Sequence, residues 1–103
     1  MSKIKEYKMF IDGEWVNSES NKTFETLNPE NNKPWAKVPE ASIKDVDRAV
    51  KAAQKAFEGT WPKLLPRERG KYLKAIATQL RENAEALGKI ETIDTGKLYR
   101  ETK

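Results

Sequence analysis

The sequence of 103 residues contains no cysteine and no histidine. Without cysteine, the chain has no disulfide framework, no thiolate nucleophile and no thiolate metal site. Without histidine, it lacks the commonest general base and the commonest protein metal ligand. Because these groups carry most acid–base and nucleophilic chemistry, we predict that the chain has no catalytic residue of its own.

Glycine loops and long apolar runs are also missing. The five glycines are isolated, and none of them forms a phosphate-binding pattern such as GxGxxG, so we predict no cofactor-binding residue. The longest apolar runs are only a few residues, too short to cross a bilayer, and "MSKIKEYK" lacks the apolar core of a secretory signal. These absences predict a cytoplasmic protein that does not bind a membrane.

Charge is plentiful and of both signs. Charged residues make up 35% of the chain, above the usual value of about 25%, and hydrophobic residues only 37%, which predicts a thin core. The net charge of +4 could indicate nucleic-acid binding, most simply through one helix face that carries Lys44, Arg48, Lys51 and Lys55. The alternative, a solvated face, is favoured because Asp47 can pair with Lys51 four residues later. We therefore expect no nucleic-acid partner.

The first forty residues carry strand signals and predict two β-hairpins within residues 8–40. In "MFIDGEWV", apolar residues flank Asp12-Gly13, a dipeptide that supplies the positive φ angles of a type I′ hairpin turn. The segments "KTFETL" and "PWAKV" predict a second pair of strands around the loop "NPENNKP", whose prolines cannot continue a ladder.

From Ser42 onward the apolar residues follow a helical period. Ser42 can cap a helix of about residues 42–58, with Asp45 completing a capping box. One face of this helix is apolar, with Ile43, Val46, Val50, Ala53 and Phe57. The helix should end near Gly59.

A second helical pattern begins at Pro66, which suits the first position of a helix because its missing N–H would be unpaired there. This helix should cover about residues 66–82. Asn83 is a poor interior residue and a good cap, so we expect either a kink or a third helix over residues 83–95 that ends at Gly96. The predicted fold class is α/β, with two N-terminal hairpins followed by two to three helices.

Large aromatic residues are spread over the whole pattern, at Trp15, Phe24, Trp35, Phe57 and Trp61. They could stack nucleic-acid bases. The favoured interpretation is that they form most of the core or a docking face for another domain.

Taken in order, "FIDGEWV", "TLNP", "DVDRAVKAAQKAF", a tryptophan followed by "RERGKYLKAIATQL", and "ETIDTGK" give the sequence a resemblance to a known family. The chain resembles the amino-terminal part of the NAD(P)-dependent aldehyde dehydrogenases over about residues 9–101. Each segment alone is weakly specific, whereas five in the same order are together strongly specific.

The resemblance implies an enzyme about five times longer that oxidises an aldehyde to a carboxylate with NAD or NADP. In such enzymes a cysteine attacks the carbonyl, hydride passes to the nicotinamide, and a glutamate activates the hydrolytic water. These groups lie downstream of this region, which packs on the cofactor-binding domain as a scaffold, and the enzymes are usually homo-oligomers. Residues 1–103 are thus expected to be an inactive N-terminal fragment of the cofactor-binding domain region, marginally stable and prone to self-association when isolated.

The resemblance also suggests a role for Asp94, whose charge opposes the dipole at the end of its helix. Several family members bind K⁺ or Na⁺ through oxygens that correspond to the main chain of Thr26 or Leu27 and to the side chain of Asp94. The alternative is that Asp94 accepts hydrogen bonds from backbone amides of the Asn28–Pro29 loop or pairs with Lys97. Neither option implies strong cation binding by this fragment.

Two functions therefore compete. The chain is either the scaffold portion of a full-length dehydrogenase, with the rest of that chain as its partner and an aldehyde as the substrate, or a stand-alone interaction module that retains the N-terminal fold without catalysis.

Overall fold

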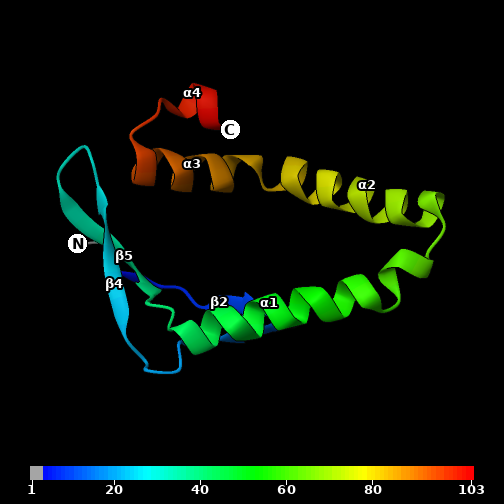
Figure 1. Cartoon of the computed structure of the whole chain (residues 1–103). Coiled ribbons are helices and arrows are strands. Elements are labelled where there is room, and N and C mark those ends of the chain that lie inside the picture. The colour runs from blue at the N-terminus through cyan, green and yellow to red at the C-terminus, as the bar shows by residue number, and fades with distance from the viewer. Residues whose placement is uncertain (1–3) are drawn as a thin grey trace.

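The computed structural model describes residues 4–103, in which five short strands precede the helices (Figure 1). Residues 1–3, which begin the stretch without a secretory-signal core, lie outside the described residues. The strands are β1 (Lys5–Glu6), β2 (Met9–Ile11), β3 (Glu14–Val16), β4 (Thr23–Asn28) and β5 (Lys33–Pro39). The helices are α1 (Ile43–Glu58), the 3₁₀ turn η1 (Trp61–Lys63), α2 (Pro66–Glu82), α3 (Ala84–Thr95) and α4 (Tyr99–Thr102).

The first predicted hairpin is confirmed. Strands β2 and β3 pair antiparallel, with Met9 opposite Val16. Asp12 and Gly13 have φ angles of 53° and 78°, the positive values that a type I′ turn requires. The tight turn therefore follows from two adjacent residues.

The second predicted hairpin is also confirmed, and it belongs to a three-stranded sheet. Strands β4 and β5 pair antiparallel from Thr23–Pro39 to Asn28–Lys33, and the register shifts between Thr26 and Leu27. Strand β1, which the sequence did not predict, pairs parallel to β5 on its other side. Two residues are too short to show an alternating pattern, and the partner strand is more than 25 positions away, so the local sequence carries no signal for β1.

Helix α1 begins as predicted. The Ser42 hydroxyl accepts from the Asp45 amide, and the Asp45 carboxylate accepts from the Ser42 amide, which completes the capping box. The helix ends at Glu58, and Gly59 is its C-cap residue, as predicted.

The helical segment after Pro66 is two helices. Pro66 occupies the first position of α2. Asn83, with φ −110° and ψ 14°, separates α2 from α3, and Gly96 ends α3 in a left-handed conformation with φ 79°. Of the two options for Asn83, the structure shows consecutive helices.

Helix α4 was not predicted, and it rests on α3 through a close contact. A Cβ added to Gly88 would lie 2.7 Å from the Cα of Lys103. The Thr102 hydroxyl also donates to the Gly88 carbonyl at 2.9 Å. Only glycine at this position allows the two helices to approach so closely.

The core is small, as the composition predicted. The buried hydrophobic residues are Ile11 and Ala36. The radius of gyration is 17.1 Å, against about 13 Å for a compact domain of this length. The accessible surface is 8805 Å², about 2,900 Å² above that expected for a compact monomer of this mass. The chain thus exposes much of the surface that a domain normally buries.

The aromatic side chains do not form a core within this segment. Trp15 and Phe57 are each 69% exposed, and Phe24 and Trp61 are also classed as exposed. Among the residues that the structure describes, none of the helices has the length and hydrophobicity needed to span a bilayer.

Candidate functional site

A groove lies between the three-stranded sheet and α3, with a volume of about 490 Å³. We call it the sheet–helix groove. Its apolar lining comes mainly from Phe24, Trp35, Val38, Leu87 and Ile90, and its polar lining from Thr26, Glu91, Asp94 and Thr95. In Figure 1, α3 lies beside β4 and β5. The groove is therefore lined by both the strand-containing and the helical part of the chain.

Asp94 faces this groove and contacts the sheet. Its Oδ1 atom accepts from the Thr26 hydroxyl at 2.5 Å and from the Trp35 indole Nε1 at 3.1 Å. Both donors are more than 50 positions away in sequence and come from neighbouring strands. An acidic residue on an apolar helix stripe is therefore explained by two polar side chains of the sheet.

The partners expected for Asp94 in the alternative to a cation were wrong. The amide of Glu30, in the loop after Asn28, donates to the Asn28 side chain, and the Lys97 amide donates to Thr95. Lys97 is in neither of the ion pairs found among the described residues. Trp35 was noted only as an aromatic residue, because no local pattern links an indole N–H to a distant carboxylate.

The three residues predicted to bind a cation are partly brought together. Thr26 and Asp94 are in direct contact, and Leu27 follows Thr26 at the register shift of β4. A hard cation requires several oxygen ligands. Residues 4–103 contain no cluster of three or more acidic side chains, so further ligands would have to be hydroxyl or carbonyl oxygens.

The same groove does not suit a dinucleotide. The carboxylates of Glu91 and Asp94 line it. Two negative groups oppose the binding of phosphates, which normally sit on helix N-termini and basic side chains.

A second feature is the exposure of the apolar faces of α1 and α2, which we call the open helix faces. On α1, Val46 and Val50 are 54% and 60% exposed. On α2, the exposed apolar residues are Tyr72, Leu73, Ile76 and Leu80. Figure 1 shows α1 and α2 as two well-separated arms that are joined at one end through η1. Exposed apolar residues that recur along one helix face are typical of an interaction site.

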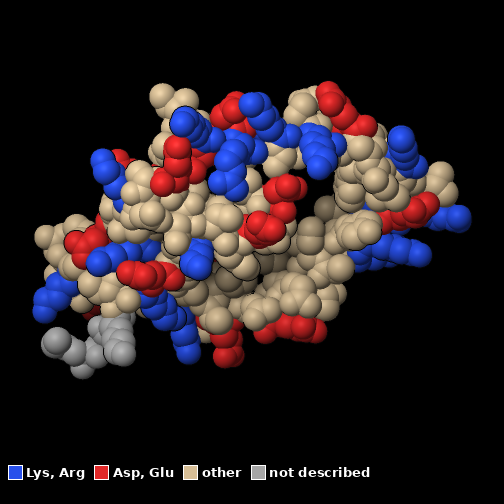
Figure 2. Space-filling model, turned by 90° about the horizontal axis from the view of Figure 1, so that it is seen from below, with Lys and Arg blue, Asp and Glu red and all other residues tan. Residues whose placement is uncertain are grey.

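The basic residues of α1 form a mixed surface. Lys51 pairs with Asp47 at 2.7 Å, as predicted, and Lys44 pairs with Glu19 at 3.3 Å. The hydrogen bond from Lys51 to Asp47 is the main cause of a raised pKa for that lysine. Figure 2 shows Lys and Arg interspersed with Asp and Glu over the face in view.

Comparison with known proteins gives a consistent result. The model of the "Aldehyde dehydrogenase family" matches residues 15–103. An aldehyde dehydrogenase of Aspergillus niger is 52% identical over 89 residues, which cover 86% of this chain and 18% of that protein. The cytosolic 10-formyltetrahydrofolate dehydrogenase of Xenopus tropicalis is 43% identical over 94 residues, 90% of this chain and 10% of that protein.

Solved structures agree with these matches. A betaine aldehyde dehydrogenase from Staphylococcus aureus in complex with NAD⁺ has a TM-score of 0.88 and 42% sequence identity, and the match covers 92% of this chain and 19% of that one. The chain therefore spans about a fifth or less of the length of the relatives it matches.

Proposed function

Because the chain belongs to the aldehyde dehydrogenase family, we propose that it is the N-terminal scaffold portion of an oxidoreductase that converts an aldehyde to a carboxylate with NAD or NADP. The single observation that carries the scaffold role is the area of about 2,900 Å² that the chain exposes beyond a compact monomer. A standard interface covers about 800 Å² on each partner, so a large body is needed to cover it.

The chain's own residues contribute shape and packing surface to this activity. A nicotinamide cofactor would accept the hydride, and NAD⁺ is supported by its presence in the similar betaine aldehyde dehydrogenase. The open helix faces and the sheet–helix groove would be covered by polypeptide that follows Lys103. We also propose that the enzyme lies in the cytoplasm, which the name of the cytosolic relative supports. We propose separately that it is a homo-oligomer; cell fractionation tests the first point and sedimentation the second.

The test is complementation between two pieces of one protein. The gene is first read past the codon for Lys103, where the proposal expects a long open frame that encodes a cysteine. Residues 1–103 and the remaining residues are then expressed separately and together. NAD(P)⁺-dependent aldehyde oxidation should appear only on co-expression, whereas a stop codon after Lys103 contradicts the proposal and favours the stand-alone interaction module.

We further propose that Thr26, Leu27 and Asp94 contribute to a site for K⁺ or Na⁺ in the longer protein. The contact between Thr26 and Asp94 supports this, as does the position of Asp94 in the last turn of α3, where the helix dipole favours a cation. Trp35 is a probe of the site because its indole donates to Asp94, and replacing Trp15 and Trp61 by Phe leaves it as the one tryptophan of this segment. Titration with K⁺ against choline should change its fluorescence, and Asp94→Asn should abolish the change; an equal response to choline contradicts the site.

A further inference from the structure

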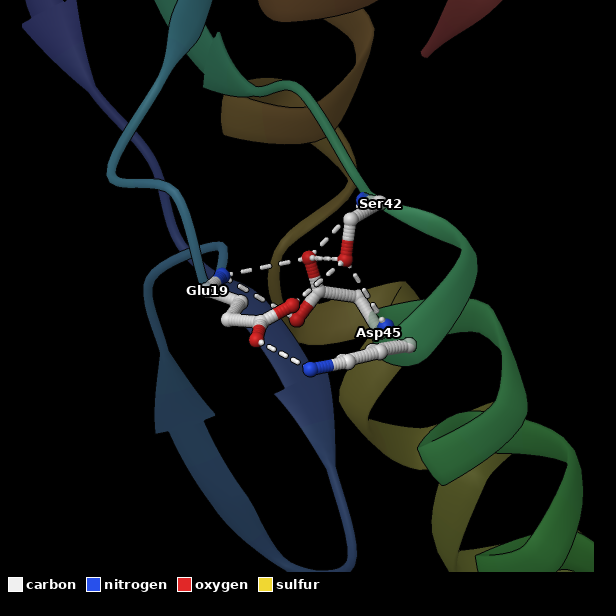
Figure 3. A network of polar contacts seen from close by, with 4 residues as sticks. Glu19, Ser42 and Asp45 are labelled. Atoms are coloured by element: carbon white, nitrogen blue, oxygen red, sulfur yellow. Dashed lines mark hydrogen bonds and ion pairs between the residues drawn. The ribbon is translucent and has the colours of Figure 1, made fainter.

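The most deeply buried large side chain among the described residues is an acid, Asp45, which is only 1% exposed. It lies in the first turn of α1, where the turn between β3 and β4 approaches the helix (Figure 3). A buried carboxylate is costly unless hydrogen bonds compensate for the lost water. The partners of Asp45 therefore indicate what this site does.

The Asp45 carboxylate binds two segments at once. Its Oδ1 and Oδ2 atoms accept from the Glu19 amide at 3.1 and 3.2 Å. Oδ2 also accepts from the Ser42 amide at 2.9 Å. The capping box needs only the contacts with Ser42, so the contacts with Glu19 are an addition that connects α1 to a turn 26 residues earlier.

The turn binds α1 in return through its own side chain. The Glu19 carboxylate lies 3.3 Å from the Ser42 hydroxyl and 3.3 Å from the Lys44 ammonium. In Figure 3 the side chains of Glu19 and Asp45 point into the same junction from opposite elements. Each segment thus contributes a carboxylate that accepts donors from the other.

Other contacts between the first hairpin and α1 have little directional character. Phe10 and Ile11 face a row of small side chains on α1, Ala49, Ala52, Ala53 and Ala56, across a space of about 350 Å³. Methyl groups around such a space do not fix one angle or register between hairpin and helix. Hydrogen bonds with defined geometry supply that specificity.

We propose that Asp45 and Glu19 form a reciprocal latch that fixes residues 17–22 on the start of α1 and thereby sets the position of the first hairpin against this helix. Opening the latch releases residues 17–22 from α1 while the β4–β5 ladder and the helices stay formed, so the hairpin is then held through β1 and its apolar contacts with α1. The device is independent of the aldehyde dehydrogenase activity and of the cation site.

The latch has a defined dependence on pH. The pKa of Asp45 is lowered, first by the Ser42 amide and also by the Glu19 amide, the Ser42 hydroxyl and Arg48, while desolvation opposes the shift. The other charged groups at the junction are the Glu19 carboxylate and the Lys44 ammonium. A lowered pKa in the folded state means that the stabilisation is complete above the ordinary pKa of aspartate and is lost as the pH falls through the lowered value. The latch is therefore closed at neutral pH and opens only at a pH below the ordinary pKa of aspartate.

The test is amide hydrogen exchange in the protein as its gene encodes it, with Asp45→Asn and the matched control Asp47→Asn. Both changes remove one negative charge from α1, but Asp47 is exposed and, among residues 4–103, its ion pair is with Lys51. In Asp45→Asn the amides of Glu19 and Ser42 should exchange about tenfold faster or more, because their charged acceptor is lost. Exchange in the β4–β5 ladder should change less than about twofold.

Two outcomes overturn the proposal: unchanged exchange at Glu19 in Asp45→Asn, or an equal rise at Glu19 in Asp47→Asn. If Asp45→Asn does not fold, the unmodified protein provides the decisive measurement as the pH is lowered. Protection of residues 17–22, corrected for the intrinsic pH dependence of exchange, should then be lost before that of β4 and β5. Simultaneous loss in all three segments contradicts a separate latch.

Discussion

The polar junction at Asp45 and the apolar face of α1 are two regions of one helix that differ in how many of their contacts lie within this chain. At the junction the Asp45 carboxylate has hydrogen-bond partners from two segments, and the described residues include no buried side-chain nitrogen or oxygen without a partner. On the apolar face of the same helix, Ile43, Val50 and Phe57 are 90%, 60% and 69% exposed. The polar contacts at the start of α1 are complete among the described residues, whereas its apolar face needs a covering surface along its whole length.

The difference reflects the range over which the two kinds of interaction act. A hydrogen-bonded junction requires only a few atoms at defined distances, and neighbouring segments can provide them. Apolar stabilisation grows with the area removed from water, at about 25 cal/mol per Å². A chain that forms about a fifth of its relatives' length can therefore complete its caps and turns while its apolar faces remain uncovered.

The largest expected effect tests whether the open helix faces are covered in the whole protein. Ile76 lies on the apolar face of α2, and Ile76→Lys would place an unpaired charge in the covered interface. We expect a loss of more than about 3 kcal/mol in the free energy of unfolding, measured by chemical denaturation.

Thr78→Lys is the control, because it introduces the same side chain on the opposite face of the same helix. It should change the free energy of unfolding by less than about 0.5 kcal/mol. Equal, small effects of both substitutions would show that α2 stays exposed, as the interaction-module alternative expects.

An intermediate effect tests the contact between α3 and α4, which is complete within the chain. Gly88→Ala places a methyl group 2.7 Å from the Lys103 backbone. We therefore expect the free energy of unfolding, measured by thermal denaturation, to fall by about 1–3 kcal/mol. Gly70 is also inside a helix, but a Cβ there meets nothing within 4 Å. Gly70→Ala should therefore stabilise the protein by about 0.5–1 kcal/mol, and a stabilising Gly88→Ala would contradict the close approach of α4.

The smallest effect tests the polar junction through its hydroxyl. Ser42→Ala removes the N-cap and should cost about 1 kcal/mol of stability in urea denaturation. Ser42→Thr retains a hydroxyl and should recover most of this loss. Equal losses for both variants would show that the hydroxyl contributes little beyond the contacts of Asp45.

Features that depend on adjacent residues could be predicted from the sequence. The Asp12-Gly13 turn, the capping box at Ser42 and the break at Asn83 each depend on the φ preference or hydrogen-bonding reach of neighbouring residues. Such preferences act locally, so they have the same effect whether or not the rest of the protein is present.

Features that depend on distant residues could not be predicted. The pairing of β1 with β5 and the binding of the Glu19 amide by Asp45 both join segments more than 20 positions apart. The resemblance placed Asp94 near Thr26, and these two side chains are in contact, but nothing in the local sequence identified Trp35 as a donor to Asp94.

The uncovered faces of α1 and α2 also have a consequence during synthesis. In a protein of the relatives' length, about 400 residues remain to be translated when this segment leaves the ribosome, which takes about 20–80 s at 5–20 residues per second. Throughout that interval Val50, Phe57 and Ile76 have no permanent neighbour. We therefore expect the nascent chain to bind chaperones that recognise apolar helices, and we expect this binding to fall as the polypeptide proposed to cover these faces emerges.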